Sequence, residues 1–271
     1  MIHEKYELNH NNEKADFFTY ILDNSQSIDP DRKRPMIVIC PGGGYSHTSD
    51  REAEPVAIQM LSKGYHASIL RYSVEPAVFP TALCQLASAI GFIRENAENW
   101  NVDSEKIIVM GFSAGGHLTA SLGVFWNRAF LTEQITYSKE QIKPNGLILS
   151  YPVISSGPHA HEGSFKALLG DKFEDKQSRE FLSLENQVTN ETPPTFLWHT
   201  VSDAAVPVEN SMLFAQSLLM RKVPLEMHIY PEGVHGLSLG TEETQSIGRD
   251  NHLQPEVENW IEMAGRWVKG L

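Results

Sequence analysis

A serine between two glycines is the first feature of the chain that could support chemistry. In GFSAGG, residues 111 to 116, Ser113 stands between Gly111 and Gly115. With Gly at about 7% of residues, this pattern alone arises by chance in roughly one chain in ten of such a length, so its context has to decide. The apolar run KIIVM predicts a strand that ends just before the serine, and HLTASLGVFW predicts a helix that follows it. This context favours a nucleophile elbow over a structural serine in a tight turn, and we predict that Ser113 is a nucleophile.

A serine hydroxyl is a weak nucleophile and needs a base, an acid that orients the base, and donors for the developing oxyanion. Asp203 follows the predicted strand TFLWHT, and His235 follows the predicted strand LEMHIYP. The order Ser113, Asp203, His235 along the chain is the order found in α/β-hydrolases. His199 is a weaker candidate for the base, because it lies within its strand rather than beyond it.

Three consecutive glycines follow another predicted strand. PGGGY, residues 41 to 45, comes directly after PMIVIC. Glycines let backbone N–H groups approach and point at a substrate oxygen, together with the N–H of Ala114 after the nucleophile. A phosphate-binding loop is the alternative, but the spacing and the lysine of a P-loop are absent and GGG is not the dinucleotide fingerprint. We therefore predict an oxyanion-binding loop.

The order of predicted elements sets these residues at one edge of a sheet. Two strand candidates, KYELN and FFTYIL, precede PMIVIC, and from residue 35 strands and helices alternate to the end of the chain. A helix is expected to end at Gly64, and another is expected over 81–100, where apolar residues recur at helical spacing. This alternation predicts an α/β fold with a mostly parallel central sheet and helices on both faces. Ligands of such sheets bind beyond the carboxyl ends of the strands.

Composition excludes some partners. The net charge of −12 and the absence of a basic stripe argue against a nucleic-acid partner. The N-terminal residues carry charges where a signal peptide has an apolar run, and no stretch approaches 18 apolar residues, so we expect a cytoplasmic protein that does not interact with membranes. Cys40 and Cys84 are expected to be buried apolar residues rather than a disulfide.

With these pieces in place, the chain resembles the α/β-hydrolase superfamily, and most closely the small bacterial esterases related to acetyl-xylan esterases and other sugar-ester deacetylases. The resemblance rests on PGGGY, REAEPVA, GFSAGGHL, SYPVIS, TPPTFLWHT, SDAAVPVEN and GVHGLSLG. It implies hydrolysis of carboxylic esters without a metal or an organic cofactor. The residues that it implies are Ser113, Asp203 and His235 as the catalytic triad, with Gly43, Gly44 and Ala114 as oxyanion donors.

Two positions depart from the related hormone-sensitive-lipase-like esterases. These usually have His where this chain has Pro41, and tend to have Asp where it has Phe112. Both departures favour the sugar-esterase branch over lipid substrates. Tyr45 and Phe112, beside the glycines and the serine, are predicted to contact the substrate.

Other residues have plainer interpretations. His159 and His161 could belong to a metal site, but no third ligand is suggested nearby, so we expect no metal. Glu52 and Glu54 suit the positive N-terminal end of a helix. Trp260 and Trp267 lie on one helical face and are expected to be core residues or a subunit contact, which leaves open a homodimer.

We expect a single domain over residues 1–271, in which about residues 155–195 form a small cap or lid insertion. The predicted activity is a serine carboxylesterase acting on short acyl esters, above all acetyl esters, of sugars or similar small-molecule alcohols. Two alternatives remain: a small serine peptidase of the prolyl-peptidase-like type, and a non-catalytic binding protein with a hydrolase fold.

Overall fold

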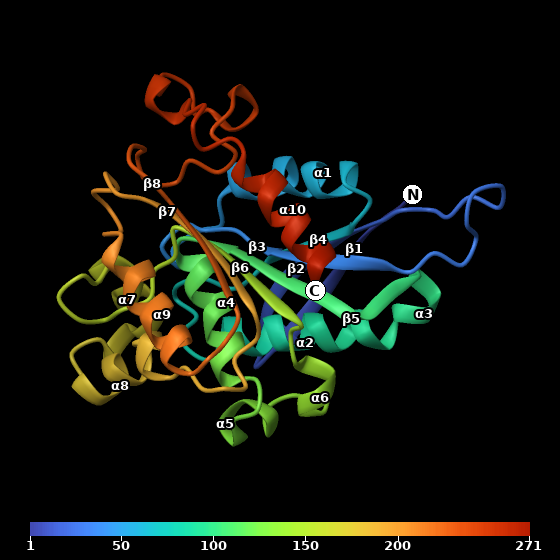
Figure 1. Ribbon diagram of the computed structural model, residues 1–271. Coiled ribbons are helices and arrows are strands. Elements are labelled where there is room, and N and C mark those ends of the chain that lie inside the picture. Colours follow the sequence, from blue (N-terminus) through green and yellow to red (C-terminus); the bar gives the residue numbers. More distant parts are fainter.

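A computed structural model describes all residues, 1–271 (Figure 1). Its centre is one eight-stranded sheet in the order β1-β2-β4-β3-β5-β6-β7-β8. β1 and β2 form an antiparallel hairpin, β2 pairs antiparallel with β4, and all other neighbours are parallel. The strands are β1 (Ile2–His10), β2 (Glu13–Ile21), β3 (Arg34–Cys40), β4 (His66–Arg71), β5 (Val102–Phe112), β6 (Gly146–Ser150), β7 (Thr195–Thr200) and β8 (Leu225–Tyr230).

Helices cover both faces of this sheet. α1 (Glu54–Ser62) and α10 (Trp260–Gly270) lie on one face, and α2 (Thr81–Glu95), α4 (Ala114–Phe125) and α9 (Glu209–Met220) lie on the other (Figure 1). The shorter helices are α3 (Ala97–Trp100), α5 (Ala129–Thr132), α6 (Lys139–Ile142), α7 (Glu162–Leu169) and α8 (Lys176–Phe181). Single 3₁₀ turns are η1 (Asp50–Glu52), η2 (Gly170–Lys172), η3 (Leu184–Asn186), η4 (Glu242–Thr244) and η5 (Asp250–His252).

The central strands are apolar throughout because both of their faces are buried. On β3, Val38 packs into the core under α2 and α4, whereas Ile37 and Ile39 pack into the core under α1 and α10. The side chains of a strand point alternately to its two faces, so a sheet covered on both sides needs apolar residues at every position. The predicted mostly parallel sheet with helices on both faces is confirmed.

Several boundaries differ from the sequence predictions. The helix predicted over 81–100 is two helices, because α2 ends at Glu95 and α3 starts at Ala97. β5 is longer than KIIVM and carries the chain up to Phe112, directly before the serine. Trp260 is fully buried and stacks on Trp198, so it is a core residue and not a subunit contact.

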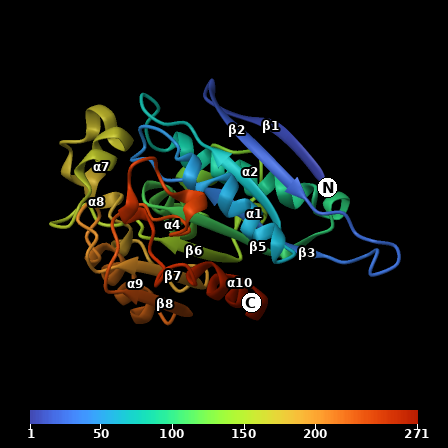
Figure 2. The same ribbon diagram turned by 90° about the horizontal axis from the view of Figure 1, so that it is seen from above.

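The segment between β6 and β7 carries α7, η2, α8 and η3 at one end of the sheet. Figure 2 shows α7 and α8 at the end opposite the N-terminus and the long loop before β3. Because β5 starts beside α3 and runs towards α7 (Figure 1), these helices lie at the carboxyl ends of the parallel strands. The predicted cap segment therefore stands where ligands of such sheets bind.

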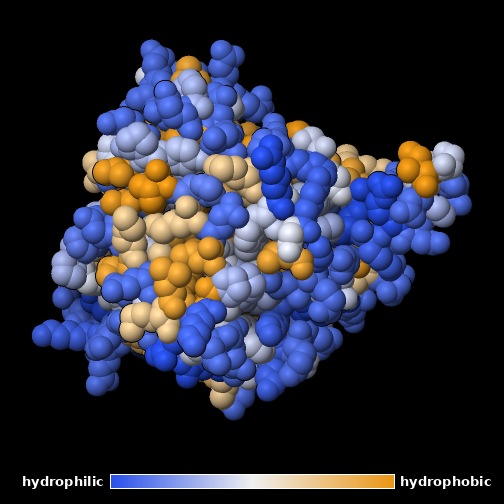
Figure 3. Space-filling model, in the orientation of Figure 1, coloured by the Kyte–Doolittle hydropathy of each residue, from blue (hydrophilic) through white to orange (hydrophobic).

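The outer surface is mostly polar. Figure 3 shows hydrophilic residues over most of one face, with separate apolar patches over β7 and β8. β8 is an edge strand that pairs only with β7, and all six of its residues are half-buried. None of the helices combines the length and the apolar character that crossing a membrane would require.

Candidate active site

Ser113 stands on a sharp turn between β5 and α4. Its backbone is at φ 52° and ψ −118°, a conformation that L-residues rarely adopt and that is typical of functional sites. The flanking glycines make this turn possible. A Cβ on Gly111 would lie 2.2 Å from the Gly115 carbonyl oxygen, and a Cβ on Gly115 would lie 2.1 Å from the Cys40 carbonyl oxygen. Any side chain at either position would push α4 away from the sheet.

The structure brings the three residues predicted as a triad into one hydrogen-bonded chain. Ser113 Oγ lies 2.7 Å from His235 Nε2, and His235 Nδ1 lies 2.6 Å from Asp203 Oδ2. Since the carboxylate only accepts, Nδ1 carries the ring proton and Nε2 is free to accept the proton of the serine hydroxyl. The side chain of Asp203 is fully buried, whereas that of His235 is 22% exposed. The partly exposed histidine therefore connects a fully buried carboxylate to the hydroxyl of Ser113.

The environment of Asp203 keeps its carboxylate ionised. Burial by itself would raise the pKa of Asp203, but hydrogen bonds from His199 and His235 lower it well below its usual range. Asp203 Oδ1 also accepts the backbone N–H groups of Ala205 and Val206 at 2.9 and 3.0 Å. One carboxylate oxygen is thus fixed by the backbone, and the other faces the histidines.

His199 contacts this carboxylate, which the sequence did not predict. Its Nε2 lies 3.0 Å from the Val206 carbonyl oxygen and 3.3 Å from Asp203 Oδ2. Both partners accept, so Nε2 carries the proton, and Nδ1 accepts from the hydroxyl of Ser211 at 2.7 Å. His199 is fully buried and cannot meet substrate in this conformation.

The glycine loop approaches the serine from the end of β3. Gly43 and Gly44 have φ values of 128° and 65°, which favour glycine, and a Cβ on Gly43 would lie 2.2 Å from the His47 carbonyl oxygen. Neither N–H donates a hydrogen bond within the protein. Ala114 begins α4, where the first N–H groups have no partner in the helix. These three predicted donors therefore have no hydrogen-bond acceptor within the protein, and Gly42, the residue before Gly43, lies against Ser113.

The predicted substrate contacts of Phe112 and Tyr45 need correction. Phe112 is fully buried on the other face of the sheet, where its ring packs against Tyr151 and Trp260. Successive side chains of a strand point to opposite faces, so the residue before the serine points into the core. Tyr45 is only 3% exposed, and its hydroxyl lies 3.0 Å from His117 Nδ1. Its ring is part of the protein interior rather than an open pocket wall.

His117 links Tyr45 to the cap segment. Its Nε2 lies 3.0 Å from the Leu182 carbonyl oxygen, so Nε2 carries the proton and Nδ1 accepts from the Tyr45 hydroxyl. Burial lowers the pKa of His117 to about 4. Next to this pair is a recess too small for a water molecule, lined by Tyr45, His117, Val153, Ser164, Phe165 and Leu168.

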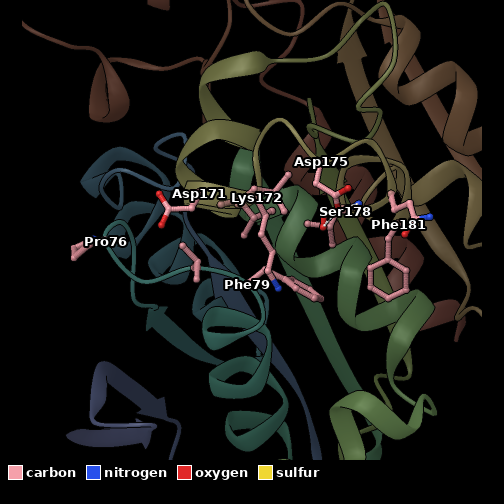
Figure 4. Close-up of a pocket in the computed structure, with 12 residues that line it drawn as sticks. Pro76, Phe79, Asp171, Lys172, Asp175, Ser178 and Phe181 are labelled. Carbon is pink, nitrogen blue, oxygen red and sulfur yellow. Dashed lines mark hydrogen bonds between the residues drawn. The ribbon is translucent and has the colours of Figure 1, made fainter.

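A larger cavity of about 710 Å³ lies on the far side of Leu168, between the cap helices and the loop after β4. Figure 4 shows Phe79 and Phe181 on one side of it, with Lys172 and Asp175 on another. Ser113 and His235 do not line it. Leu168 lines both spaces and separates the closed recess from the cavity.

The two loop histidines considered for a metal have other contacts. His161 Nδ1 faces the hydroxyl and the backbone N–H of Ser164 at 2.8 and 3.2 Å, which caps the start of α7. Burial, and to a smaller extent His235, lowers the pKa of His161. His159 lies beside Glu209. No group of three or more metal-ligating side chains converges in the structure.

Glu52, which the sequence placed only at the start of a helix, has contacts that the sequence did not predict. It is 3% exposed and accepts hydrogen bonds from the glycine loop and from Tyr151. No signal in the sequence separated it from the exposed Glu54, two residues further on.

One family model and several curated proteins match this chain. The BD-FAE family model matches residues 23–218. Over 79% of its length the chain is 38% identical to an endo-1,4-beta-xylanase B of Butyrivibrio fibrisolvens, of which it covers 34%. Over 83% of its length it is 28% identical to an acetylxylan esterase of Xylanibacter ruminicola, of which it covers 45%. The chain thus spans less than half the length of these curated relatives.

Solved structures match over almost the whole chain. A carboxylesterase from Lactobacillus plantarum superposes with a TM-score of 0.88 at 30% identity, covering 100% of this chain and 98% of the other. An acetyl ester-xyloside bifunctional hydrolase from Caldicellulosiruptor lactoaceticus superposes with a TM-score of 0.80 at 38% identity, covering 96% and 89%.

Proposed function

The chain belongs to the BD-FAE family and has the α/β-hydrolase fold, and from this membership and the site around Ser113 we propose that it is a serine carboxylesterase. Its substrates are short acyl esters, above all acetyl esters, of sugars or similar small alcohols. The acyl and alcohol parts are suggested by the relatives named acetylxylan esterase and acetyl ester-xyloside hydrolase. The observation that carries the mechanism is the hydrogen-bonded chain from Ser113 through His235 to Asp203, at 2.7 and 2.6 Å.

In the proposed mechanism, Ser113 Oγ attacks the ester carbonyl carbon while His235 Nε2 takes the hydroxyl proton. The N–H groups of Gly43, Gly44 and Ala114 stabilise the negative charge on the carbonyl oxygen. His235 then gives its proton to the leaving alkoxide, which departs as the free alcohol. Water, deprotonated by His235, attacks the acyl-enzyme and releases the carboxylic acid and the restored serine.

The direct test is a screen of the purified protein on nitrophenyl esters and on acetylated sugars. Release of nitrophenol shows esterase activity, and release of acetate from the sugars shows the proposed alcohol class. Hydrolysis of nitrophenyl acetate without hydrolysis of acetylated sugars would support the carboxylesterase activity and refute the assignment of sugar esters as substrates. If neither is hydrolysed, the proposal as a whole falls.

We expect kcat/KM to fall through one ionisation as the pH is lowered, because the base must be neutral to take the serine proton. Asp203 adds no second step, since its pKa lies well below its usual range and it stays ionised. The measurement is kcat/KM for nitrophenyl acetate from about pH 4.5 to about pH 9, a range that brackets this ionisation. A rate that stays flat down to the acid end of that range would contradict a histidine base.

Stability has to be followed in the same experiment. Burial lowers the pKa of both His66 and His117 to about 4. In the unfolded chain a histidine binds its proton at about pH 6.5, so below that pH the folded protein holds fewer protons than the unfolded chain. Stability therefore falls as the pH decreases from about 6.5 to about 4. Circular dichroism at each pH separates this loss from protonation of the base.

We also expect kcat/KM to peak at acetyl to butyryl esters and to fall at least tenfold by octanoyl. The recess beside Tyr45 and His117, which α7 closes at Leu168, has no room even for a water molecule, so we expect the cap segment to leave little space for a long acyl chain. Each methylene that fits adds about 0.8 kcal/mol of binding, whereas one that clashes costs at least as much. The measurement is kcat/KM across nitrophenyl esters of two to eight carbons, and no activation is expected at an oil–water interface.

Two neighbouring leucines provide a matched control for this profile. Leu168 and Leu169 are both 5% exposed and both line the cavity of about 710 Å³, but only Leu168 also lines the recess. Leu168→Ala should raise the octanoyl-to-butyryl ratio several-fold by joining the two spaces, and Leu169→Ala should leave it unchanged. A wild-type profile still rising at eight carbons would refute the short-chain specificity.

A further inference from the structure

A buried carboxylate lies beside the candidate active site and has no part in the proposed mechanism. Glu52 is 3% exposed, and it forms no ion pair with any Lys, Arg or His. Buried carboxylates are rare unless they are paired, because removal from water disfavours the charged form. Its two oxygens instead accept one neutral donor each. Glu52 Oε2 accepts the N–H of Gly42 at 2.8 Å, and Oε1 accepts the hydroxyl of Tyr151 at 2.7 Å.

The first hydrogen bond fixes the glycine loop against the nucleophile turn. Gly42 directly precedes Gly43, the first of the proposed loop donors. A Cβ on Gly42 would lie 2.7 Å from Glu52 Oε2, 2.9 Å from the Phe112 carbonyl oxygen and 3.0 Å from Ser113 Cβ. The loop is therefore packed between Glu52 and the residue that carries the nucleophile.

The second hydrogen bond reaches the loop that carries His235. The oxygen of Tyr151 accepts the backbone N–H of Ser238 at 2.8 Å. The ring of Tyr151 packs edge-on against the ring of His235, with 5.2 Å between their centroids. Glu52 is therefore connected through one side chain to both the backbone and the imidazole of the histidine loop.

Arg51, the residue before Glu52, also forms hydrogen bonds with the loop that carries His235. Arg51 Nη1 donates to the carbonyl oxygen of Gly236 at 2.7 Å, and its Nε donates to the carbonyl oxygen of Thr244. The hydroxyl of Ser238 donates to the Arg51 carbonyl oxygen at 2.6 Å. Hydrogen bonds thus extend from the η1 turn to both the glycine loop and the histidine loop.

We propose that Glu52 is a positioning residue that places the oxyanion donors of the glycine loop relative to Ser113 and His235. This inference rests on the proposed serine esterase function and adds to it a residue outside the triad. Glu52 touches neither the substrate nor the reacting atoms. Its effect is on the geometry that the transition state needs, since oxyanion donors have to lie where the negative charge develops.

Glu52→Gln is expected to lower kcat about 10- to 100-fold and to change KM by less than about threefold. The amide keeps the size of the side chain but has only one accepting oxygen, so either Gly42 or Tyr151 loses its acceptor. Displacing a catalytic group by about 1 Å can cost roughly 100-fold in rate, whereas binding of the ground-state ester depends little on the oxyanion donors.

The decisive measurement compares kcat/KM with the affinity for a trifluoromethyl ketone, which forms a tetrahedral adduct with a serine nucleophile. In Glu52→Gln, the inhibition constant of this compound should rise in proportion to the loss of kcat/KM. Glu54→Gln is the matched control: it is the same change two residues away on an exposed side chain, and it should leave both quantities unchanged.

Tyr151→Phe removes the hydroxyl that donates to Glu52 and should lower kcat less than Glu52→Gln does. The double variant should lose less than the product of the two single losses, because the two residues act through one contact.

Each other outcome is decisive as well. Wild-type kcat and wild-type inhibitor affinity in Glu52→Gln, with only a lower melting temperature, would overturn the positioning role and leave the esterase standing. A change confined to KM would do the same. If Glu52→Gln does not fold, Tyr151→Phe decides the question by the same two quantities. A wild type without esterase activity, or an active Ser113→Ala variant, would overturn the proposed function and this inference with it.

Discussion

Replacing Ser113 by alanine is expected to lower kcat by about a millionfold, because removal of the serine from a comparable triad has an effect of this size. The fold should survive. Alanine lacks only the hydroxyl, and the hydrogen bond to His235 at 2.7 Å is made to a partly exposed ring that water can satisfy. Turnover of nitrophenyl acetate measures the loss, and near-UV circular dichroism checks the packing of the variant.

A fluorophosphonate probe gives the same experiment a second readout. The wild type should be labelled on Ser113, and Ser113→Ala should not be labelled at all. Ser121→Ala is a suitable control, because this serine is also buried but lies further along α4, and its loss should affect neither labelling nor rate. A Ser113→Ala variant that keeps more than about a tenth of the rate would refute the assignment. A wild type that neither reacts with the probe nor turns over esters would favour the non-catalytic binding protein.

The chemistry at the strand ends could be predicted because its determinants are local. Gly111 and Gly115 are needed where α4 crosses the end of β5, and that need is visible in a few consecutive residues. Asp203 and His235 each follow a run of apolar residues, and parallel strands bring their carboxyl ends to the same edge of a sheet. Sequence order and strand position were therefore enough to propose which side chains meet.

What could not be predicted depends on contacts between distant segments. Phe112 and Tyr45 were expected at the substrate because they neighbour the serine and the glycines, but strand alternation and packing against His117 turn both rings inward. Glu52 and Glu54 look alike in the sequence. Only the approach of Gly42 and of Tyr151, which is 99 residues away from Glu52, makes one of them a buried acceptor. A hydrogen-bond partner so far away in the sequence cannot be predicted from the residues that flank a glutamate.

Asp203→Asn is expected to lower kcat by about 10⁴-fold. In serine proteases with the same three groups, an asparagine at this position costs about 10⁴-fold because the histidine takes the wrong tautomer. Here the backbone determines which end of the new side chain faces His235. Asp203 Oδ1 accepts the N–H groups of Ala205 and Val206, and only an oxygen can do so.

In the Asp203→Asn variant, the amide nitrogen of the new side chain would therefore occupy the place of Oδ2, 2.6 Å from His235 Nδ1. An NH₂ group there donates to Nδ1, so the ring proton moves to Nε2, which can then no longer take the proton of Ser113. Fluorophosphonate labelling should slow in parallel with kcat, because both need the serine to be activated. Asp171→Asn, which changes an exposed carboxylate in the cap segment, is the control and should be active. A loss of less than about tenfold in Asp203→Asn would mean that His235 does not depend on this carboxylate for its tautomer. The orienting role would then have to pass to another group, and no other carboxylate contacts the ring.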